Sequence, residues 1–431
     1  MTSDAGLLFA ARALRTFAYG FLSVVLALYL SGLGLTPAQV GGLFTAALLG
    51  GAATTSAVGA LAGRWGRRGV LRRFALLMAV SGAVYALGAP AWLLLLAALA
   101  GTISPSGYEV GPFFPLEQAA LPEVSRGAPE VGLFAWYNLV GTVAVALGAL
   151  AAGVVPSVLA PLGVPDAGAQ RGLVWAFAAT GLVLAALYGR LSDRVEAPVV
   201  GGGGGGLRRS RRTVLRLTAL FGLDALAGGL VVQSLVAFWF HQRFGVGLAE
   251  LGPLFFGTNL LSALSYLAAA RLSRRIGLLN TMVFTHLPSN VLLALVPLMP
   301  TWPAAAGILL LRHALSQMDV PTRQAYTLAL VAPEERAAAA GITNAVRPAA
   351  ASVAPLLSGL ALQAAAGGLP FVLAGGLKAV YDLTLWALFR TVPLPSPGAG
   401  APAGARPAGA AVKAISAVTA DELGQRRVEP P

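Results

Sequence analysis

The chain has 431 residues, of which 57% are hydrophobic and only 11% are charged, and its formal net charge is +13. A soluble domain carries about a quarter charged residues, so this composition excludes an ordinary water-soluble protein. The absence of cysteine excludes disulfides, thiolate metal sites and cysteine nucleophiles. With only three histidines, we expect no zinc cluster and no other metal or cofactor.

Apolar segments of roughly 20 residues, each long enough to cross a hydrocarbon core of about 30 Å, recur along the chain. We predict twelve transmembrane helices, at residues 8–31, 38–62, 71–89, 91–113, 131–155, 171–190, 214–240, 250–270, 279–299, 303–330, 338–363 and 369–390. The first segment contains Arg12 and Arg15 and is longer than the apolar core of a signal peptide. We therefore expect it to remain in the membrane as an anchor.

Basic residues are concentrated in the connections on one predicted side of the membrane. These connections are 63–73, 120–130, 190–213, 271–278 and 331–337. The opposite connections carry little beyond Arg171 and Arg243. This positive-inside pattern accounts for the net charge without a nucleic-acid partner. It predicts a multi-pass protein of the inner (cytoplasmic) membrane with both termini in the cytoplasm.

Two segments lack the character of membrane helices. Residues 191–213 combine arginines with the run Gly201–Gly206, which is typical of a flexible cytoplasmic linker. The glycine run has no following lysine, so we do not expect a nucleotide site there. Residues 392–431 are rich in Pro, Ala and Gly, and we predict a disordered cytoplasmic tail. The remaining segments, 1–190 and 214–391, are the two predicted membrane domains.

The two membrane domains repeat each other. A shift from residue 115 to residue 321 aligns Pro115–Ala119 with Pro321–Ala325, and it places Glu130 opposite Arg336. The same shift pairs Asn138 with Asn344. Several matches at one offset indicate a parallel repeat. The predicted fold is therefore an all-α membrane protein of twelve transmembrane helices in two pseudo-symmetric six-helix bundles.

The connection after the second segment reads Gly-Ala-Leu-Ala-Gly-Arg-Trp-Gly-Arg-Arg, residues 59–68. It resembles the signature loop between helices 2 and 3 of the major facilitator superfamily, twelve-helix bacterial type, and the resemblance extends over about residues 8–390. The resemblance implies a transporter that works by alternating access, not an enzyme. It also implies that the loop contributes to gating, and the candidates are Arg64, Gly66, Arg67 and Arg68.

This loop departs from the family pattern at one position. Gly63 occupies the place of the acid in the family signature, and Arg274 occupies that place in the second copy of the loop. In the family the acid helps to hold the cytoplasmic side closed. We therefore expect this chain to close its gate in another way, or to close it less tightly. Gly66 still suits the tight turn, because glycine tolerates positive φ.

Ionisable residues inside the apolar segments indicate function, because each costs roughly 2.5–3.5 kcal/mol at the centre of a bilayer. They are Glu109, Glu117, Asp224, Arg312, Asp319, Arg323, Arg347, Lys378 and Asp382. The spacing of Arg312, Ser316, Asp319 and Arg323 predicts one polar stripe on a helix. We expect these side chains to face a cavity or one another.

Glu109 and Asp224 are the candidates for proton coupling or substrate binding. Glu109 lies in a segment interrupted by proline and glycine, and broken helices expose backbone groups to substrates and ions. Asp224 lies near the middle of its segment with no arginine close in sequence. The alternatives are that Glu109 pairs with Arg12, Arg15 or Arg312, and that Asp224 is a hydrogen-bonded structural acid.

The other intramembrane charges divide into binding and structural candidates. Asp319, Arg312 and Arg347 are further candidates for substrate or proton handling. The alternatives are a structural Asp319–Arg323 pair and an Arg347 that only neutralises Asp319. We interpret Lys378 and Asp382 as a structural i,i+4 pair. Glu117 and Arg323 are repeat equivalents of opposite sign, so we consider a gating bridge between the two halves. An ordinary interhelical salt bridge of Glu117 is the alternative. Arg12 and Arg15 are expected to snorkel to the membrane surface.

The leading functional prediction is proton-coupled efflux of a small organic solute, which would make the chain an antiporter. The alternative is proton-coupled uptake of an organic anion, motivated by Arg312, Arg323 and Arg347. A membrane sensor that transports nothing is a third possibility. The expected partners are a small-molecule substrate, protons and the lipid bilayer, and the chain is expected to act as a monomer.

Overall fold

The computed structural model describes residues 3–125, 130–196, 210–332 and 335–392. These residues form helices and no strands, which confirms the all-α prediction. The glycine run Gly201–Gly206 of the predicted linker and the predicted tail from residue 393 onward lie outside the described residues. The side chains of Glu130 and Asn344, which the repeat singled out, also lie outside them.

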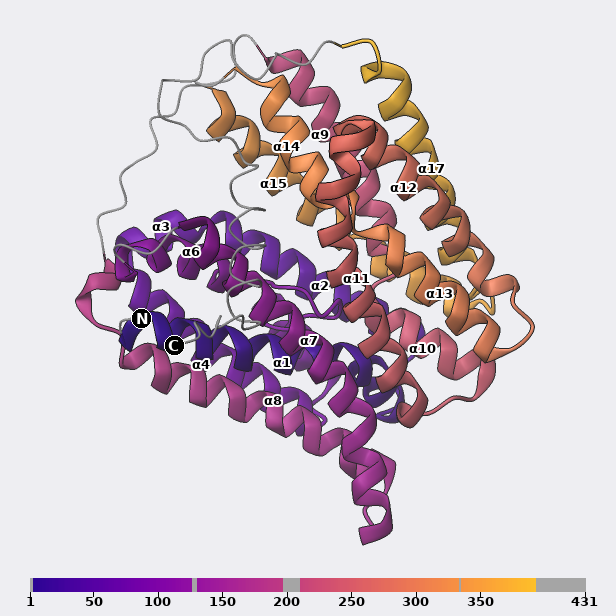
Figure 1. Cartoon of the computed structure of the whole chain (residues 1–431). Helices are drawn as coiled ribbons and strands as arrows, with labels where there is room; N and C mark the ends of the chain where they lie inside the picture. Colours follow the sequence, from indigo (N-terminus) through magenta and orange to yellow (C-terminus); the bar gives the residue numbers. More distant parts are fainter. Residues whose placement is uncertain (1–2, 126–129, 197–209, 333–334, 393–431) are drawn as a thin grey trace, which may run out of the picture.

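The helices form two groups that follow each other along the chain (Figure 1). The first group contains α1 (Ser3–Gly32), α2 (Pro37–Ser56), α3 (Val58–Trp65), α4 (Arg67–Ala86), α5 (Ala91–Leu99), α6 (Phe113–Val124), α7 (Glu130–Leu159) and α8 (Asp166–Gly189). The second group contains α9 (Arg211–Gly229), α10 (Gln233–Phe244), α11 (Leu248–Ile276), α12 (Leu278–Leu295), α13 (Trp302–Ser316), α14 (Asp319–Leu330), α15 (Arg336–Ser352), α16 (Ala354–Gln363) and α17 (Leu369–Phe389). The short helix η2 (Asp193–Glu196) follows α8.

Most of the predicted membrane crossings are present as long apolar helices. Within the described residues, nine helical stretches are long and apolar enough to span a bilayer, and the pair α2–α3, bent by 59°, makes a tenth. The two other predicted crossings, 91–113 and 303–330, are each divided into two shorter helices, α5 with α6 and α13 with α14. These two divided crossings stay predictions, and they are repeat equivalents of each other.

The break between α5 and α6 follows directly from the sequence. Residues 100–112 contain two prolines and three glycines, and all three glycines, Gly101, Gly107 and Gly111, have positive φ. A side chain at Gly101 would also place its Cβ 2.4 Å from the backbone of Gly50 in α2. Glycine is therefore required at this position both for the turn and for the close approach of the two segments.

The two groups contact each other at one end of the molecule, which we call the closed end. There α2 packs against α16, and α7 packs against α11. A Cβ added at Gly359 would lie 2.3 Å from the carbonyl oxygen of Pro37. A Cβ added at Gly153 would lie 2.6 Å from the carbonyl oxygen of Leu248. Small residues thus allow the backbones of the two groups to touch.

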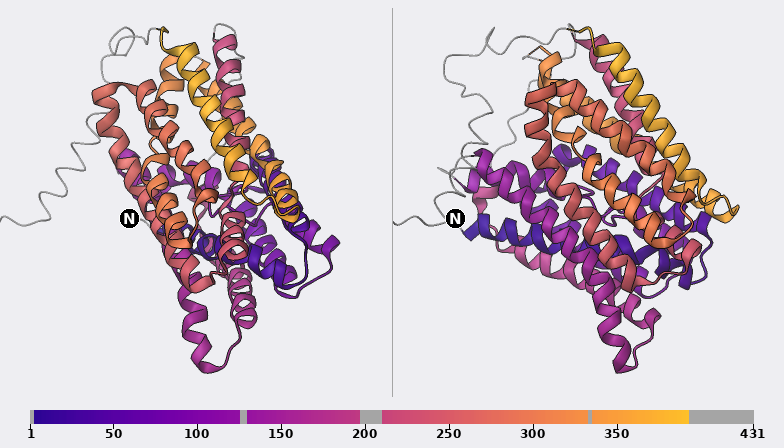
Figure 2. Two further views of the ribbon diagram at one scale, coloured as in Figure 1. Left: turned by 90° about the vertical axis from the view of Figure 1, so that its right-hand side faces the viewer. Right: turned by 45° about the vertical axis from the view of Figure 1, so that its right-hand side comes forward.

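The opposite end carries the arginine-rich connections after α3 and α8 and the start of α9, and we call it the basic end. Figures 1 and 2 show the ribbons of the two groups diverging toward this end, with α3 and α6 on one side and α14 and α15 on the other. At the start of α9, the backbone N–H of Ser210 donates to the carboxylate of Glu335 at 2.8 Å.

Polar contacts join the groups midway along α1. Gln233, at the start of α10, donates from Nε2 to Ser23 Oγ at 2.8 Å. The neighbouring Ser234 donates from Oγ to the carbonyl of Ser23 at 2.8 Å and from its backbone N–H to the carbonyl of Pro105 at 3.0 Å. The seventh predicted segment, 214–240, is divided between α9 and α10. This break and the break between α5 and α6 therefore lie next to each other beside α1.

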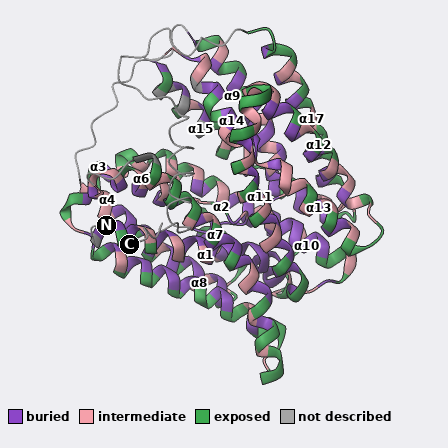
Figure 3. Cartoon of the chain, viewed as in Figure 1, coloured by how far each residue is buried: buried purple, intermediate pink, exposed green. Residues whose placement is uncertain are grey.

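Burial is arranged as expected for a protein dissolved in lipid. Figure 3 shows buried residues along the inner faces of the helices and exposed residues on the outside. Many exposed residues are large and apolar, including Leu182 in α8 and Leu383 in α17. Such surfaces are stable in hydrocarbon but not in water.

Candidate functional site

The first group of helices encloses four charged side chains, which we call the first cluster: Arg12 and Arg15 of α1, Glu117 of α6, and Glu109 from the break before α6. Arg15 forms a two-pronged pair with Glu117, with Nη1–Oε1 and Nη2–Oε2 distances of 2.8 and 2.6 Å. Glu109 Oε1 forms ion pairs with Arg12 Nη1 at 2.7 Å and with Arg15 Nη2 at 3.0 Å. Two cations therefore face two carboxylates, and the cluster is neutral.

Two tyrosines complete the hydrogen bonds of the buried Glu117. Tyr188 of α8 donates to Oε1 at 2.6 Å, and Tyr137 of α7 donates to Oε2. The Glu117 and Arg15 side chains have no exposed surface. A buried ion pair is tolerated when its remaining hydrogen-bonding positions are filled in this way. Glu117 is therefore part of an interhelical salt bridge within the first group.

The expectation that Arg12 and Arg15 snorkel to the membrane surface is wrong. Both side chains are buried, and they turn inward to the two glutamates. Arg12 also lies over the rings of Phe114 and Tyr137, at 4.6 and 4.5 Å from the ring centroids. The carboxylates and aromatic faces stabilise the guanidinium groups more than the distant interface would.

The second group encloses a larger set of charges around Asp224 of α9. Lys378 of α17 approaches Asp224 Oδ1 at 2.5 Å. Arg323 of α14 and Arg347 of α15 both approach Oδ2 at 3.2 Å. His286 of α12 lies 4.0 Å from Oδ1. Asp224 is thus not the lone acid that its sequence surroundings suggested, because four other helices bring basic side chains to it.

The interpretation of Lys378 and Asp382 as a local pair is also corrected. Lys378 binds Asp224, while Asp382 contacts His286 Nδ1 at 3.0 Å and accepts a hydrogen bond from Asn290 at 2.8 Å. Both partners of Asp382 belong to α12. Charges from other helices therefore outweigh the i,i+4 spacing on α17.

The polar stripe predicted on the tenth segment is divided by the break between α13 and α14. On α14, Asp319 and Arg323 form the i,i+4 pair at 2.7 Å. Arg312 belongs to α13 and is separated from them by Gln317 and Met318. The second cluster is therefore Asp224, Asp319, Asp382, Arg323, Arg347, Lys378 and His286, with Arg312 beside it.

Arg312 differs from the other intramembrane arginines. Among the described residues, no carboxylate lies within 4.0 Å of its guanidinium group, although Asp224 and Asp319 are close enough to act on it electrostatically. Its Nη1 contacts His313 Nε2 at 3.2 Å, and its buried Nε has no hydrogen-bond partner. An arginine with unfilled donors at an interior position is suited to bind an anionic group.

The signature loop is held by the segment after α8. The Glu196 carboxylate, in η2, accepts hydrogen bonds from the backbone N–H groups of Arg67 at 2.6 Å and Arg68 at 3.0 Å. It thereby places a carboxylate at the N-terminus of α4, where the helix dipole stabilises negative charge. Gly66 has φ of +71°, and a Cβ there would lie 2.7 Å from the Glu196 carboxylate. Glu196 thus supplies an acid beside the loop that lacks one at Gly63.

The arginine side chains of this loop also bind the same segment. Arg68 pairs with Asp193 at 3.2 Å and donates to the carbonyl of Leu191 at 2.8 Å. Arg67 donates to the carbonyl of Val195 at 3.3 Å. Arg64 instead lies over the ring of Trp65, with 6.0 Å to its centroid. The gating roles of these residues stay predictions.

Glu117 and Arg323, considered for a bridge between the halves, do not meet in this structure. Glu117 is bound by Arg15 within the first group, and Arg323 is bound by Asp319 and Asp224 within the second. A bridge between them would require both pairs to break.

Sequence reasoning missed His286 of the second cluster and several residues that bind the charged side chains or the signature loop. His286 and Asn290 gave one signal, since both are polar residues inside the predicted span 279–299. Tyr137, Tyr188 and Glu196 gave none, because their partners are distant in sequence.

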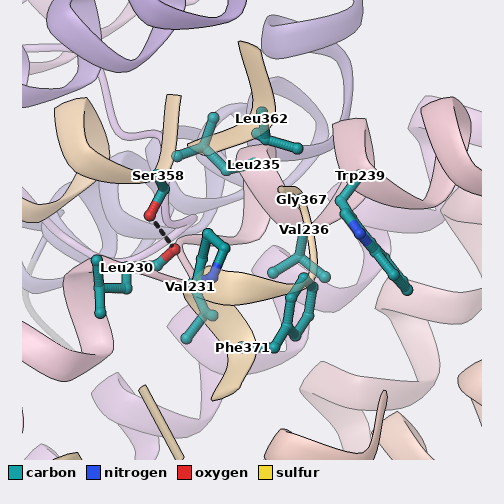
Figure 4. A pocket seen from close by; sticks show the side chains of 10 residues that line it. Leu230, Val231, Leu235, Val236, Trp239, Ser358, Leu362, Gly367 and Phe371 are labelled. Atoms are coloured by element: carbon teal, nitrogen blue, oxygen red, sulfur yellow. Dashed lines mark hydrogen bonds between the residues drawn. The ribbon is translucent and has the colours of Figure 1, made fainter. Parts of the chain in front are cut away.

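An apolar pocket near the closed end is separate from these charges. Figure 4 shows it lined by residues of α10, α16 and α17, among them Leu235, Trp239 and Phe371. Ser358 donates to the carbonyl of Leu230 at 2.7 Å at its edge. None of its lining residues is charged, so it offers no partner for an ion.

Comparisons with known proteins agree with this architecture. The model of the Major Facilitator Superfamily matches residues 8–316. A membrane protein of Saccharomyces cerevisiae (strain ATCC 204508 / S288c), YJR124C, is 27% identical over 425 residues, which cover 90% of this chain and 94% of that protein. The solved structure of the nucleoside transporter NupG has a TM-score of 0.72 and 15% identity, covering 90% of this chain and 100% of its own.

Two further solved structures share the fold. A bacterial homologue of the human lysosomal transporter Spinster, inward-facing and unoccupied, has a TM-score of 0.69 and 15% identity, covering 89% of this chain and 96% of its own. The human organic anion transporter MFSD10 has a TM-score of 0.59 and 19% identity, covering 89% and 99%. With the family model covering most of the chain, this protein belongs to the Major Facilitator Superfamily and is a membrane transporter, not an enzyme.

Proposed function

We propose that this transporter moves a small organic anion across the membrane by alternating access, with Arg312 as the main contact for the anionic group. The observation that carries the proposal is the half-buried Arg312: its buried Nε has no hydrogen-bond partner, and no carboxylate lies within 4.0 Å of its guanidinium group among the described residues. A carboxylate, sulfate or phosphate on the substrate would fill its unused donors with charge-assisted hydrogen bonds.

Arg347 is the second contact that we propose. Its side chain is 27% exposed, the largest fraction among the cations around Asp224. It also shares Asp224 Oδ2 with Arg323 at the same distance of 3.2 Å. A substrate anion can therefore bind Arg347 while Arg323 and Lys378 continue to neutralise Asp224.

The charge balance also favours an anionic substrate. The second cluster and Arg312 together hold four permanent cations against three carboxylates: Arg312, Arg323, Arg347 and Lys378 against Asp224, Asp319 and Asp382. Uncompensated charge is costly in a membrane interior. A bound anion would remove this excess.

Proton-coupled efflux through Glu109 and Asp224 receives less support. That hypothesis treated the two acids as isolated carboxylates, whereas Glu109 is paired with two arginines and Asp224 is surrounded by basic residues. The human organic anion transporter supports the proposal only by sharing the fold.

We further propose that the basic end faces the cytoplasm, as the positive-inside rule requires. Both termini would then be cytoplasmic, the protein would lie in the inner membrane as a monomer, and the conformation described here would be inward-facing. The contacts of α2 with α16 and of α7 with α11 would seal the outer side.

Flux in proteoliposomes tests the proposed substrate class. We would compare labelled glucuronate, succinate and 4-nitrophenyl sulfate with neutral glucose and cationic tetraphenylphosphonium. Arg312→Gln removes the charge at the proposed contact, and Arg243→Gln removes one at an exposed position on α10. A charge-assisted hydrogen bond contributes about 1.5–3 kcal/mol, so we expect Arg312→Gln to weaken apparent affinity by about 10- to 150-fold.

The control should transport the same anion as the wild type. The proposal is wrong if the wild type moves only neutral or cationic compounds, or if Arg312→Gln retains full affinity for the transported anion.

A further inference from the structure

His286 lies between two carboxylates in the interior of the second group. Its Nδ1 is 3.0 Å from Asp382 Oδ1, and its Nε2 is 4.0 Å from Asp224 Oδ1. The imidazole ring and the Asp382 side chain are both buried. A histidine held between two acids can take up a proton without leaving a bare charge, because either carboxylate stabilises the resulting imidazolium.

The geometry specifies how the ring is oriented. Asn290 Nδ2 donates to Asp382 Oδ2 at 2.8 Å, which fixes the carboxylate so that Oδ1 faces the ring. Nδ1 lies 3.0 Å from Asp382 Oδ1 and 3.2 Å from Asn290 Nδ2. We assign the ring proton to Nδ1, because an ionised Asp382 needs a donor there. The lone pair of Nε2 then points toward Asp224 and is the position open to a second proton.

Asp224 connects this ring to the proposed substrate contacts. The oxygen that faces Nε2, Oδ1, is also the one that binds Lys378 at 2.5 Å. The other oxygen binds Arg323 and Arg347. A proton on Nε2 adds a cation to Asp224, and it therefore weakens the hold of that carboxylate on Arg347 and the other bases.

The helices that pack against α12 are α11, α13, α14 and α17, and α9 and α15 carry two of the charges of the second cluster. The charged or titratable groups considered on these helices are Asp224 of α9, Tyr266 of α11, Arg312 and His313 of α13, Asp319 and Arg323 of α14, Arg347 of α15, and Lys378, Tyr381 and Asp382 of α17. The Tyr381 ring lies edge-on to the imidazole, with 6.0 Å between the centroids. Among these groups, Asp382 and Asp224 are the two that come within 4.0 Å of the ring as ion-pair partners.

We propose that His286 is the proton-binding site of this transporter and that its protonation increases the affinity of the Arg312–Arg347 site for the organic anion. This inference rests on the proposed function. Protonation raises the excess positive charge around Asp224 from one to two, so the proton and the anion favour each other's binding. By linkage the effect is reciprocal, and the transport mode that follows is symport of a proton with the anion.

Histidine NMR on the full chain tests the site without any substrate. The protein has only three histidines, so labelling their rings with ¹⁵N gives three sets of signals. His286→Gln identifies the signals of interest, and His241→Gln, at the exposed end of α10, is the matched control. We expect the His286 ring signals to show uptake of a second proton when the pH is lowered, and Asp382→Asn to alter this change.

Proton flux tests the coupling. In liposomes that contain the pH dye pyranine, 4-nitrophenyl sulfate serves as the probe because it stays charged at these pH values and carries no proton itself. We expect proton entry with the anion in the wild type and in His241→Gln. In His286→Gln we expect anion exchange to persist and proton entry to fall at least tenfold. If His286→Gln fails to fold, Asp382→Asn is measured in its place.

Two results would overturn the proposal. One is a His286 ring that keeps a single protonation state from pH 8.5 to 5. The other is full proton-driven accumulation of the probe by His286→Gln. If the wild type moves no anion at all, the proposed function fails, and the NMR titration still decides whether His286 binds the proton.

Discussion

Replacing Gly359 at the closed end should shift the transporter toward the conformation in which that end is open. A Cβ at Gly359 would lie 2.3 Å from the carbonyl oxygen of Pro37, whereas ordinary contacts of this kind begin at 3.4 Å. The α2 and α16 backbones must therefore separate by about 1 Å for alanine and by more for leucine. Overpacking of this kind costs about 1–3 kcal/mol. This cost applies only while the closed end is closed, so the ratio of conformations should shift about 5- to 150-fold.

Spin labels can report this shift, because the chain has no cysteine of its own. Labels on Ala38→Cys and Ala364→Cys would flank the closed end, where the Ala38 N–H contacts Gln363 at 3.3 Å. The label separation should increase in Gly359→Leu. Gly376→Leu is the matched control, since Gly376 is an exposed helical glycine of α17 with nothing within 4 Å of its Cβ position.

Equal distance distributions in the wild type, Gly359→Leu and Gly376→Leu would refute this reasoning. They would mean that the contact between α2 and α16 adjusts locally without opening the closed end.

Two further predictions concern the stability of the first group of helices and are checked by thermal unfolding of the purified protein. Glu196→Ala removes the carboxylate that caps α4, so we expect the free energy of unfolding to fall by about 0.5–2 kcal/mol. The control Asp193→Ala changes a side chain that is 89% exposed, and it should lower the free energy of unfolding by less than about 1 kcal/mol. Glu117→Gln leaves the buried Arg15 without one of its two carboxylates and should lower the free energy of unfolding by about 3–5 kcal/mol. Tyr137→Phe removes one hydrogen bond to the Glu117 carboxylate and should lower it by about 1 kcal/mol. Equal melting temperatures for Glu196→Ala and Asp193→Ala, or for Glu117→Gln and the wild type, would contradict these assignments.

The positions of the long helices could be predicted from sequence because hydrophobicity is a local property. The segments predicted at 131–155 and 250–270 correspond to α7 and α11. The break between α5 and α6 was indicated by its prolines and glycines. The break between α13 and α14 was not predicted, since Gln317 and Met318 are neither proline nor glycine.

The charge partners were harder to predict, because they are chosen by the tertiary fold. Arg12 finds Glu109 at a separation of 97 residues, and Lys378 finds Asp224 at a separation of 154. Local rules pointed instead to the membrane surface for Arg12 and to Asp382 for Lys378. In a low-dielectric interior a close carboxylate from another helix outweighs both local preferences. Identifying the charged residues was therefore possible from sequence. The pairs of Glu109 with Arg12 and Arg15 and of Asp319 with Arg323 were offered only as alternatives, and the partners of Asp224 and Asp382 were not indicated.

The attachment of Glu196 to the start of α4, together with that of Ser210 to Glu335, sets a limit on how far the basic ends can separate. Each of these residues is fixed to its own group of helices, so the chain between them acts as a tether with a fixed contour length. At about 3.6 Å per residue, the step from residue 196 to residue 210 cannot exceed about 50 Å. The amplitude of the proposed alternating-access motion is thus bounded by covalent geometry, whatever the substrate is.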